Sequence, residues 1–436
     1  MKKMGICFIK GVFFITLMFN VGVPQESKHL TTKVIQTNFQ NLTGIITLEE
    51  SLNESSHIKQ IVRTDNALLF CDKNFNAIDS ISIKNNTRIT CSKSLKYLLL
   101  DDQSINEKNY SEVKRKLTLI DSNGKEFWSK PNLILGEDEQ ISFIPSDYNG
   151  NVFKVDYAYS TITTISIGGN IINKVELFGN PEYTPGRRLY MDISKSGEYY
   201  VVLAEKIPSH ERTASGAPIE RFVVNNKIIR TDTMKVFEKE VGEPSLFLFN
   251  NDGILINEME VKGEQPSNVF INNDGTMILY ITTNLGTVFD NFIISLINKD
   301  FEELFSTSIS GSPINVLFKK DILIITYLDG INNKFKLVAF NINTGKFIWA
   351  NELQNVPVSL EEINQQSFSL LTCSDVKRQL QSEYFIYNVF DINGKYISQL
   401  EIGYINNEYL YSVKPEIYFN NQYFIKNKQV NMINVY

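Results

Sequence analysis

Apolar and polar positions along this chain come in short blocks, which are typical of β-strands separated by tight turns. In the segment Lys336–Leu353, one apolar run ends at Asn343-Thr344-Gly345 and a second apolar run follows the turn. Glycine tolerates the positive φ that such turns need, and asparagine and threonine side chains hydrogen-bond to nearby backbone. Two strand-like runs joined in this way predict a β-hairpin.

Related hairpins recur along the rest of the chain. Their ranges are 68–83, 117–130, 162–177, 246–261, 292–309, 337–353 and 387–402. The successive intervals between turn residues are 45, 84, 47, 45 and 49, measured at Gly124, Gly169, Gly253, Asp300, Gly345 and Gly394. Apart from the long second interval, the spacing clusters near 46 residues. A period of 40–50 residues with several strands in each unit indicates a β-propeller.

A second set of hairpins precedes the first set within each unit, for example at 189–203, 269–282, 315–328 and 359–373. Each unit then holds four strands, an A–B hairpin followed by a C–D hairpin. The strand segments are rich in Val, Ile, Phe, Tyr and Leu, as expected for sheets covered on both faces. An open sandwich of the same strands does not predict a constant period. The predicted fold is therefore all-β, a single β-propeller domain over residues 30–436.

The number of blades follows from the repeat count. Seven C–D turns are visible, and the 42 residues after Gly394 provide three strands, at 416–419, 423–425 and 430–435. We expect the N-terminal segment 33–50 to supply the fourth strand, so that the N- and C-terminal strands share a blade and close the ring. Such closure removes the exposed edges of an open sheet. The prediction is eight four-stranded blades, with seven as the alternative because the first unit is short.

The N-terminus has the pattern of an export signal. Lys2, Lys3 and Lys10 precede the apolar run Gly11–Val23, and polar residues follow it. A basic segment before a 13-residue apolar run is typical of a secretory signal and short for a membrane span. The small-residue cleavage motif is poor, so residues 1–25 are predicted to be a signal peptide or an uncleaved N-terminal anchor. The expected location is secreted, periplasmic or at the cell surface.

One long insertion interrupts the fourth unit between its B and C strands, at residues 206–243. A loop of this length in a compact domain is usually functional or disordered. The hypothesis is that this insertion contacts a partner. Its candidate binding residues are His210, Glu211, Arg212, Glu220 and Arg221.

Several turns resemble known propeller repeats. The segment Asn343–Trp349, with Trp four positions after Gly, resembles the pyrroloquinoline-quinone-type (PQQ-like) repeat. Asp121–Trp128 is a second match, and Asp391–Lys395 is a third that has lost the Trp. Ser194–Tyr200 and Asn273–Gly275 look instead like the inner hairpin of WD-like propellers. The chain thus resembles the propeller superfamily broadly and in a degenerate form.

The quinoprotein enzymes within that superfamily bind a quinone and Ca²⁺, use a catalytic Asp and often carry adjacent cysteines. This chain has no adjacent cysteines, and none of its residues can be matched to the family's Asp or Ca²⁺ ligands. The resemblance therefore implies a fold and no cofactor. Other relatives use the same ring as an interaction surface, so fold alone does not decide function. We predict that Trp128 and Trp349 pack blades together.

Composition narrows the chemistry further. The net charge of −6 gives no basic surface for nucleic acid. Only three histidines occur, without zinc-site or nucleophile-elbow spacing, which argues against a zinc site or a catalytic triad. The acidic runs Asp101-Asp102 and Glu137–Glu139 are interpreted as solvated loops. Cys71 and Cys91 are interpreted as small buried side chains, with a disulfide between them as the alternative.

Together these observations predict an exported, monomeric, non-enzymatic propeller that acts as a binding scaffold for a protein or glycan. No metal or cofactor is expected, and membrane contact is expected only through the N-terminal anchor. The alternative is an enzyme that uses the central channel, either a degenerate quinoprotein dehydrogenase or a carboxylate-dependent hydrolase or lyase.

Overall fold

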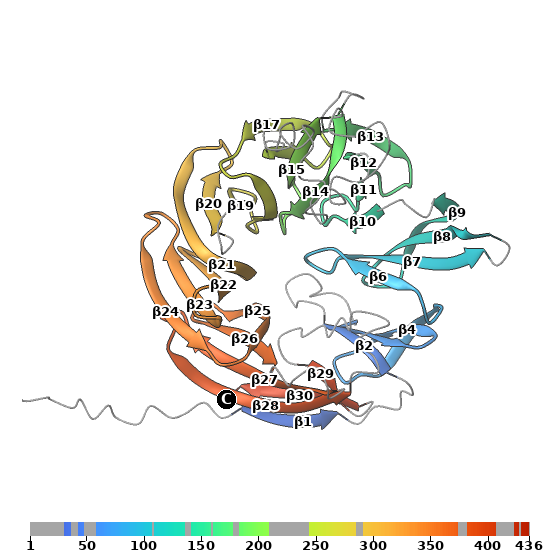
Figure 1. The fold of residues 1–436 in the computed structure, drawn as a ribbon. Helices are drawn as coiled ribbons and strands as arrows, with labels where there is room; N and C mark the ends of the chain where they lie inside the picture. Colours follow the sequence, from blue (N-terminus) through green and yellow to red (C-terminus); the bar gives the residue numbers. More distant parts are fainter. Residues whose placement is uncertain are drawn as a thin grey trace, which may run out of the picture.

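The computed structural model shows an all-β molecule whose sheets stand side by side around a ring (Figure 1). It describes residues 30–35, 42–47, 58–106, 109–135, 141–157, 160–177, 183–208, 244–284, 291–373, 382–406, 423–426 and 429–435. Every regular element in these ranges is a β-strand. Within them, no helix has the length and apolar character needed to cross a membrane.

Five sheets contain four antiparallel strands in chain order. The first is β2 (Leu42–Thr47), β3 (Gln60–Thr64), β4 (Ala67–Cys71) and β5 (Ala77–Ser82). The second is β6 (Arg88–Cys91), β7 (Tyr97–Asn106), β8 (Asn109–Asp121) and β9 (Glu126–Leu135). The third is β10 (Ile141–Pro145), β11 (Val152–Asp156), β12 (Thr161–Ile165) and β13 (Ile171–Glu176). The fourth is β14 (Tyr183–Ile193), β15 (Tyr199–Pro208), β16 (Pro244–Asn250) and β17 (Leu255–Glu260). The fifth is β25 (Val356–Asn364), β26 (Ser367–Cys373), β27 (Ser382–Asp391) and β28 (Tyr396–Asn406).

A seven-stranded sheet lies between the fourth and fifth of these. It contains β18 (Gln265–Ile271), β19 (Met277–Asn284), β20 (Asn291–Asn298), β21 (Glu303–Lys319), β22 (Ile322–Asp329), β23 (Lys334–Asn341) and β24 (Phe347–Leu353). Strand β21 pairs with β20 through its first half and with β22 through its second half. The two ladders meet at Gly311, so one strand passes from the outside of the ring to the inside without a loop.

The remaining sheet joins the two ends of the chain, in the order β1 (Leu30–Ile35), β30 (Gln429–Val435) and β29 (Tyr423–Lys426). Leu30 pairs with Val435 and Ile35 pairs with Val430, which confirms that N- and C-terminal strands share a sheet. The predicted N-terminal segment 33–50 is only partly right, because Leu42–Thr47 instead begins the next sheet. The predicted strand at 416–419 lies outside the described residues.

The predicted number of four-stranded blades is wrong for the part of the chain that the structure describes. Five such blades are present, rather than eight or the alternative seven. The difference arises because β21 merges two runs of strands into one sheet, and because the terminal sheet has three described strands.

Hydrophobic cores lie between neighbouring sheets. Phe153 of β11 packs against Tyr200 of β15 with ring centroids 4.6 Å apart, and Tyr200 stacks on Phe249 at 4.9 Å. The middle strands are therefore buried on both faces, and all five residues of β12 are buried. The outer strands β13 and β17 show mostly exposed residues, because they form the periphery of the ring (Figure 1).

Glycine turns also connect the sheets, and they explain the Gly-to-Trp spacing seen in the sequence. Gly394 has φ +76, and a Cβ there would lie 2.5 Å from the ring of Trp349 on the preceding sheet. Trp349 Nε1 donates to the Ile392 carbonyl at 3.1 Å. Gly169 is covered by Trp128 in the same way. The prediction that both tryptophans pack sheets together is confirmed.

The predicted start of the long insertion, at residue 206, differs from the structure, because residues 206–208 still belong to β15. Strand β15 ends at Pro208, β16 begins at Pro244, and the two strands pair in antiparallel fashion. The rest of the predicted insertion, 209–243, lies outside the described residues. Its candidate residues His210, Glu211, Arg212, Glu220 and Arg221 lie outside the described residues.

Replacing Gly311 by alanine should destabilise the protein by about 2–4 kcal/mol. Gly311 has φ +145, and a Cβ there would lie 1.9 Å from the Leu328 carbonyl oxygen. The matched control is Gly168→Ala, because the nearest atoms to a Cβ at that position would lie 3.8 Å away, which is ordinary van der Waals contact. Urea unfolding should show that the control changes the free energy of unfolding by less than about 1 kcal/mol. Equal losses in both variants would contradict the close approach at the β21 junction.

Candidate functional site

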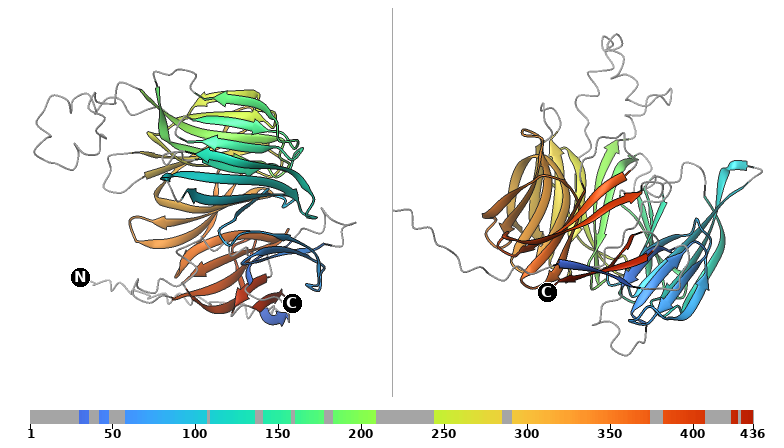
Figure 2. Two further views of the ribbon diagram at one scale, coloured as in Figure 1. Left: turned by 90° about the vertical axis from the view of Figure 1, so that its right-hand side faces the viewer. Right: turned by 90° about the horizontal axis from the view of Figure 1, so that it is seen from below.

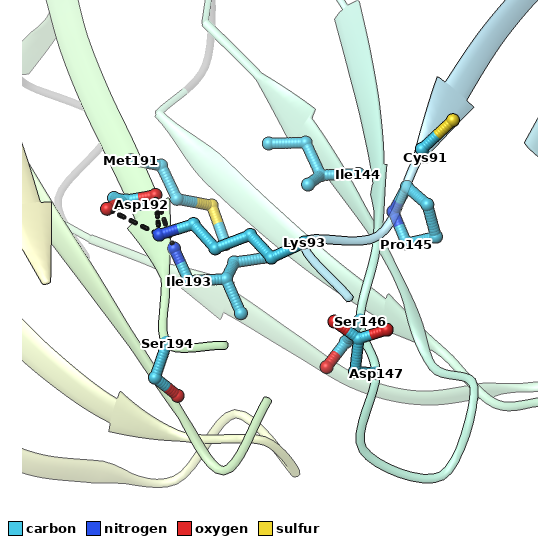
Figure 3. A pocket seen from close by; sticks show the side chains of 10 residues that line it. All are labelled: Cys91, Lys93, Ile144, Pro145, Ser146, Asp147, Met191, Asp192, Ile193 and Ser194. Atoms are coloured by element: carbon cyan, nitrogen blue, oxygen red, sulfur yellow. Dashed lines mark hydrogen bonds and ion pairs between the residues drawn. The ribbon is translucent and has the colours of Figure 1, made fainter. Parts of the chain in front are cut away.

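The first strands of three consecutive sheets, β6, β10 and β14, end beside one another on the inner side of the ring, where they line a small pocket (Figure 3). Its volume is about 60 Å³, and it is lined by Cys91, Lys93, Ile144, Pro145, Ser146, Asp147, Met191, Asp192, Ile193 and Ser194. Sites for small organic ligands usually measure roughly 300–1,000 Å³. The pocket is therefore the size of a single side chain or a few water molecules.

A shared turn chemistry places these residues. Each of the three strands runs into a turn that begins with serine, and the serine N–H donates to the carbonyl of the residue that starts the next strand or just precedes it. The distances are 2.9 Å for Ser92 to Tyr97, 2.8 Å for Ser146 to Asn151 and 2.9 Å for Ser194 to Tyr199. Serine suits this position because its short hydroxyl also accepts a backbone N–H within the turn, as Ser92 Oγ does from Tyr97 at 3.0 Å.

Asp192 connects three sheets. Lys93 Nζ, from the β6–β7 turn, lies 2.8 Å from Oδ1 and 2.9 Å from Oδ2 of Asp192 (Figure 3). The N–H of Ile271, at the end of β18, donates to Oδ2 at 2.9 Å, and the N–H of Ile193 donates to Oδ1 at 2.9 Å. The Lys93 side chain is 37% exposed and that of Asp192 is 20% exposed. The carboxylate would thus keep two backbone donors if the lysine moved away.

Asp147 is the second carboxylate of the pocket, and it is committed to structure. It accepts hydrogen bonds from the Ser92 hydroxyl and, at 2.7 Å, from the Ser94 N–H. The residue is buried, and its partners belong to the neighbouring sheet. Asp147 therefore holds the β6–β7 turn against the β10–β11 turn.

Behind the pocket, a buried amide links further turns. Asn251 Nδ2 lies 3.0 Å from Ser146 Oγ and 2.6 Å from the Gly197 carbonyl, and its Oδ1 accepts from Asn151 Nδ2 at 2.5 Å. These bonds tie the β16–β17 turn to the inner turns of its own sheet and of the preceding sheet. Buried polar groups that are paired in this way give the turns a defined position.

The chemistry available at the pocket is that of a binding site. Its two carboxylates are occupied by ordered donors, and its walls include the apolar side chains of Ile144, Pro145, Met191 and Ile193. Among the described residues, no group of three or more His, Cys, Asp or Glu side chains is arranged to hold a metal ion. The one ammonium at the rim, Lys93, is paired with Asp192.

Sequence patterns alone do not predict this site. The turn Ser194–Tyr200, which resembles a WD-like hairpin, does border the pocket. The sequence does contain one signal for the site, because a serine follows Cys91 and again follows Pro145. These serines begin turns at equivalent strand ends. Lys93 and Asp192 are 99 residues apart, so only the ring brings them together.

One acidic run also differs from the prediction. Asp101 was interpreted as part of a solvated loop, but it lies in β7 and is buried. Arg115 Nε lies 3.0 and 3.1 Å from its two carboxylate oxygens, and the guanidinium packs over Phe143 at 5.1 Å. The buried ion pair is stable because its geometry is bidentate and the arginine has further partners.

The cysteines form no disulfide among the residues described. Cys71 is fully buried, and Cys91 and Cys373 are partly buried. The interpretation of Cys71 and Cys91 as small buried side chains holds over the disulfide alternative. Burial, with the nearby charge of Asp72, raises the pKa of the Cys71 thiol to about 12.

Comparison with known proteins places the fold and leaves the chemistry open. No protein-family model matches the chain. No curated protein matches it in sequence either. Among solved structures, the WD40 domain of SCAP from fission yeast is 9% identical, with a TM-score of 0.50 and coverage of 93% of this chain and 98% of that one. The C-terminal WD40 domain of Sif2 is 10% identical, with a TM-score of 0.49 and coverage of 93% and 98%. BamB from Moraxella catarrhalis is 12% identical, with a TM-score of 0.43 and coverage of 92% and 97%.

The similarity to the WD40 domain of SCAP supports the predicted β-propeller fold. At such identities, structural likeness shows the fold alone.

Asp192→Ala should cost about 1.5–3 kcal/mol of unfolding free energy, because it leaves the N–H groups of Ile271 and Ile193 without their charged acceptor. Lys93→Met should cost less than about 1 kcal/mol, since it removes only a partly exposed ion pair. Urea unfolding of the two variants beside the native chain measures both values. If the lysine variant lost as much stability as the aspartate variant, the ion pair rather than the backbone contacts would hold the sheets together.

Cys71 should react with iodoacetamide about a hundredfold more slowly in the folded chain than in urea at pH 8. Its raised pKa keeps the thiolate scarce at that pH, and the rate should increase as the pH rises. Peptide mapping by mass spectrometry at timed intervals gives the rate, with the urea-unfolded chain as the control. Equal rates in both states would show that Cys71 is accessible.

Proposed function

We propose that this protein is an exported, non-enzymatic β-propeller that binds a protein or glycan partner as a monomeric scaffold. The observation that carries the proposal is that the carboxylates around the pocket accept hydrogen bonds from neighbouring turns. Asp147 and Asp192 are engaged by donors from neighbouring turns, which makes them structural groups rather than acids or bases. Propellers of this kind offer their faces and rims as surfaces for recognition.

Export rests on the N-terminal pattern of basic residues followed by the apolar run Gly11–Val23. Residues 1–25 act as a signal peptide or an uncleaved anchor in this proposal. The protein would then work in a periplasm, at a cell surface or outside the cell, and an uncleaved anchor would be its only membrane contact.

The ring is proposed to have eight sectors. The two ladders on β21 support counting the seven-stranded sheet as two sectors that share one strand. The sheet of β29, β30 and β1 would be the eighth sector. In this arrangement the terminal strands close the ring at its seam.

The second candidate is an enzyme that uses the central channel, either a degenerate quinoprotein or a carboxylate-dependent hydrolase or lyase. The observation in its favour is that an ammonium and a carboxylate, Lys93 and Asp192, meet beside a pocket at the ends of the inner strands. A catalytic role would require turnover that is lost in both Lys93→Met and Asp192→Asn while the fold is kept.

The proposal predicts that the full chain captures a defined partner from its native source in a way that depends on the insertion. The experiment compares the native chain with a variant whose residues 209–243 are replaced by a short Gly-Ser link, and with a variant carrying alanine at His210, Glu211, Arg212, Glu220 and Arg221. Cross-linking followed by reciprocal capture identifies the partner, and thermal melts confirm folding.

Loss of the partner in both variants supports the insertion as the recognition element. Retention in both variants moves recognition to the ring. Absence of any partner, together with turnover that requires Lys93 and Asp192, would replace the proposal with the enzyme.

A further inference from the structure

Five large apolar side chains are exposed together on the outside of the ring. Their exposed fractions are 66% for Ile171, 48% for Ile172, 60% for Ile254, 46% for Leu255 and 49% for Ile256. We call this set the outer-strand patch. Single exposed apolar residues are common, whereas clusters of this kind usually mark an interaction surface.

The members of the patch are neighbours in space. Ile171 and Ile172 are the first two residues of β13. Ile254 precedes β17, and Leu255 and Ile256 are its first two residues. Strands β13 and β17 are the outermost strands of adjacent sheets (Figures 1 and 2). Asn173 Nδ2 donates to the carbonyls of Asp252 at 3.0 Å and Gly253 at 2.9 Å. These bonds hold the turn before β17 against β13, so the two parts of the patch lie on neighbouring outer strands.

The charges around the patch favour a basic partner. Asp252, Glu258 and Glu260 are exposed on the β17 side. On the β13 side, Lys174 is already paired with Glu176 at 2.9 Å. Lys130 also lies near this side, where it approaches Gly169. Among the described residues named here the balance is negative, and it suits an apolar segment flanked by lysine or arginine.

The strand edges beside the patch are poor templates for an added strand. Strands β13 and β17 each pair with only one neighbour, so alternate N–H groups point outward. The N–H of Lys174 is bonded to Asn173 Oδ1 at 2.8 Å, and that of Glu258 to Asn257 Oδ1 at 3.0 Å. Each asparagine caps the amide that follows it, which blunts the edge. A partner would therefore contact the side chains rather than the backbone.

We infer that the outer-strand patch docks an amphipathic helix of a protein partner. The apolar face of the helix covers the five side chains through residues at helical spacing, and its flanking lysine or arginine residues meet Asp252, Glu258 and Glu260. This inference rests on the proposed function and adds to it the class of partner.

The test uses a fluorescein-labelled peptide of 18 residues, designed as an amphipathic helix with leucine on one face and lysine at the flanks. Fluorescence anisotropy with the full chain should give binding at least about tenfold tighter than for the same peptide with glutamate in place of lysine. A peptide with proline at its centre should bind about as weakly, because it cannot form the helix.

The protein variants locate the binding. Ile171→Ser combined with Ile254→Ser should weaken binding about tenfold. The matched control is Ile331→Ser combined with Ile348→Ser, because these residues are also exposed and apolar and lie on another sheet, in the β22–β23 turn and on the outer strand β24. The control should bind like the native chain, and thermal melts should match for all three proteins.

Four results would overturn the inference. Equal binding of the proline peptide would mean that the occupant is not a helix. Equal loss in the two double variants would mean non-specific apolar contact. Sedimentation that shows a dimer of the native chain, lost only in the patch variant, would assign the patch to a second copy of this chain. A partner that is captured equally by the native chain and the patch variant would refute the patch and leave the proposed function intact. The proposed function itself fails only if the native chain captures no partner.

Discussion

The ring depends on close contacts between a glycine turn of one sheet and a side chain of the sheet before it. Gly169 and Gly394 have positive φ, and a Cβ at either would lie 3.1 or 2.5 Å from Trp128 or Trp349. The turn must therefore be small, so that the side chain of the preceding sheet can lie against it. A glycine turn precedes the outer strand, and the side chain four residues after the glycine covers the glycine turn of the next sheet, as Trp128 covers Gly169 and Trp349 covers Gly394. One short motif therefore positions consecutive sheets.

The inner turns solve a different problem, since strand ends must be joined where backbone polar groups accumulate. Here Asp147, Asp192 and Asn251 accept or donate across sheet boundaries, and each satisfies groups from at least one neighbouring sheet. The polar side chains that would otherwise suit catalysis are used as connectors. Among the described residues, large apolar side chains are instead exposed on the outer strands β13 and β17.

Part of the fold was predictable from local pattern. The hairpin repeat, the sharing of a sheet by the two chain ends, the position of the insertion and the packing role of Trp128 and Trp349 all follow from turn chemistry and spacing. The number of four-stranded sheets could not be predicted from local pattern, because β21 runs through Gly311 without the turn residues that mark a boundary elsewhere. Asp101 was also missed, since its partner Arg115 gives no sign in the sequence that both are buried.

The sequence by itself determined the repeating β-hairpins and hence a propeller, because strand alternation and glycine turns are properties of a few adjacent residues. Only the tertiary structure decided which side chains meet. Lys93 reaches Asp192 across an intervening sheet, and Asn173 holds the turn at Asp252 and Gly253 against β13, because the curvature of the ring sets these distances. Neither contact has a local signature, so the pocket and the outer-strand patch emerge only when the sheets are placed around the ring.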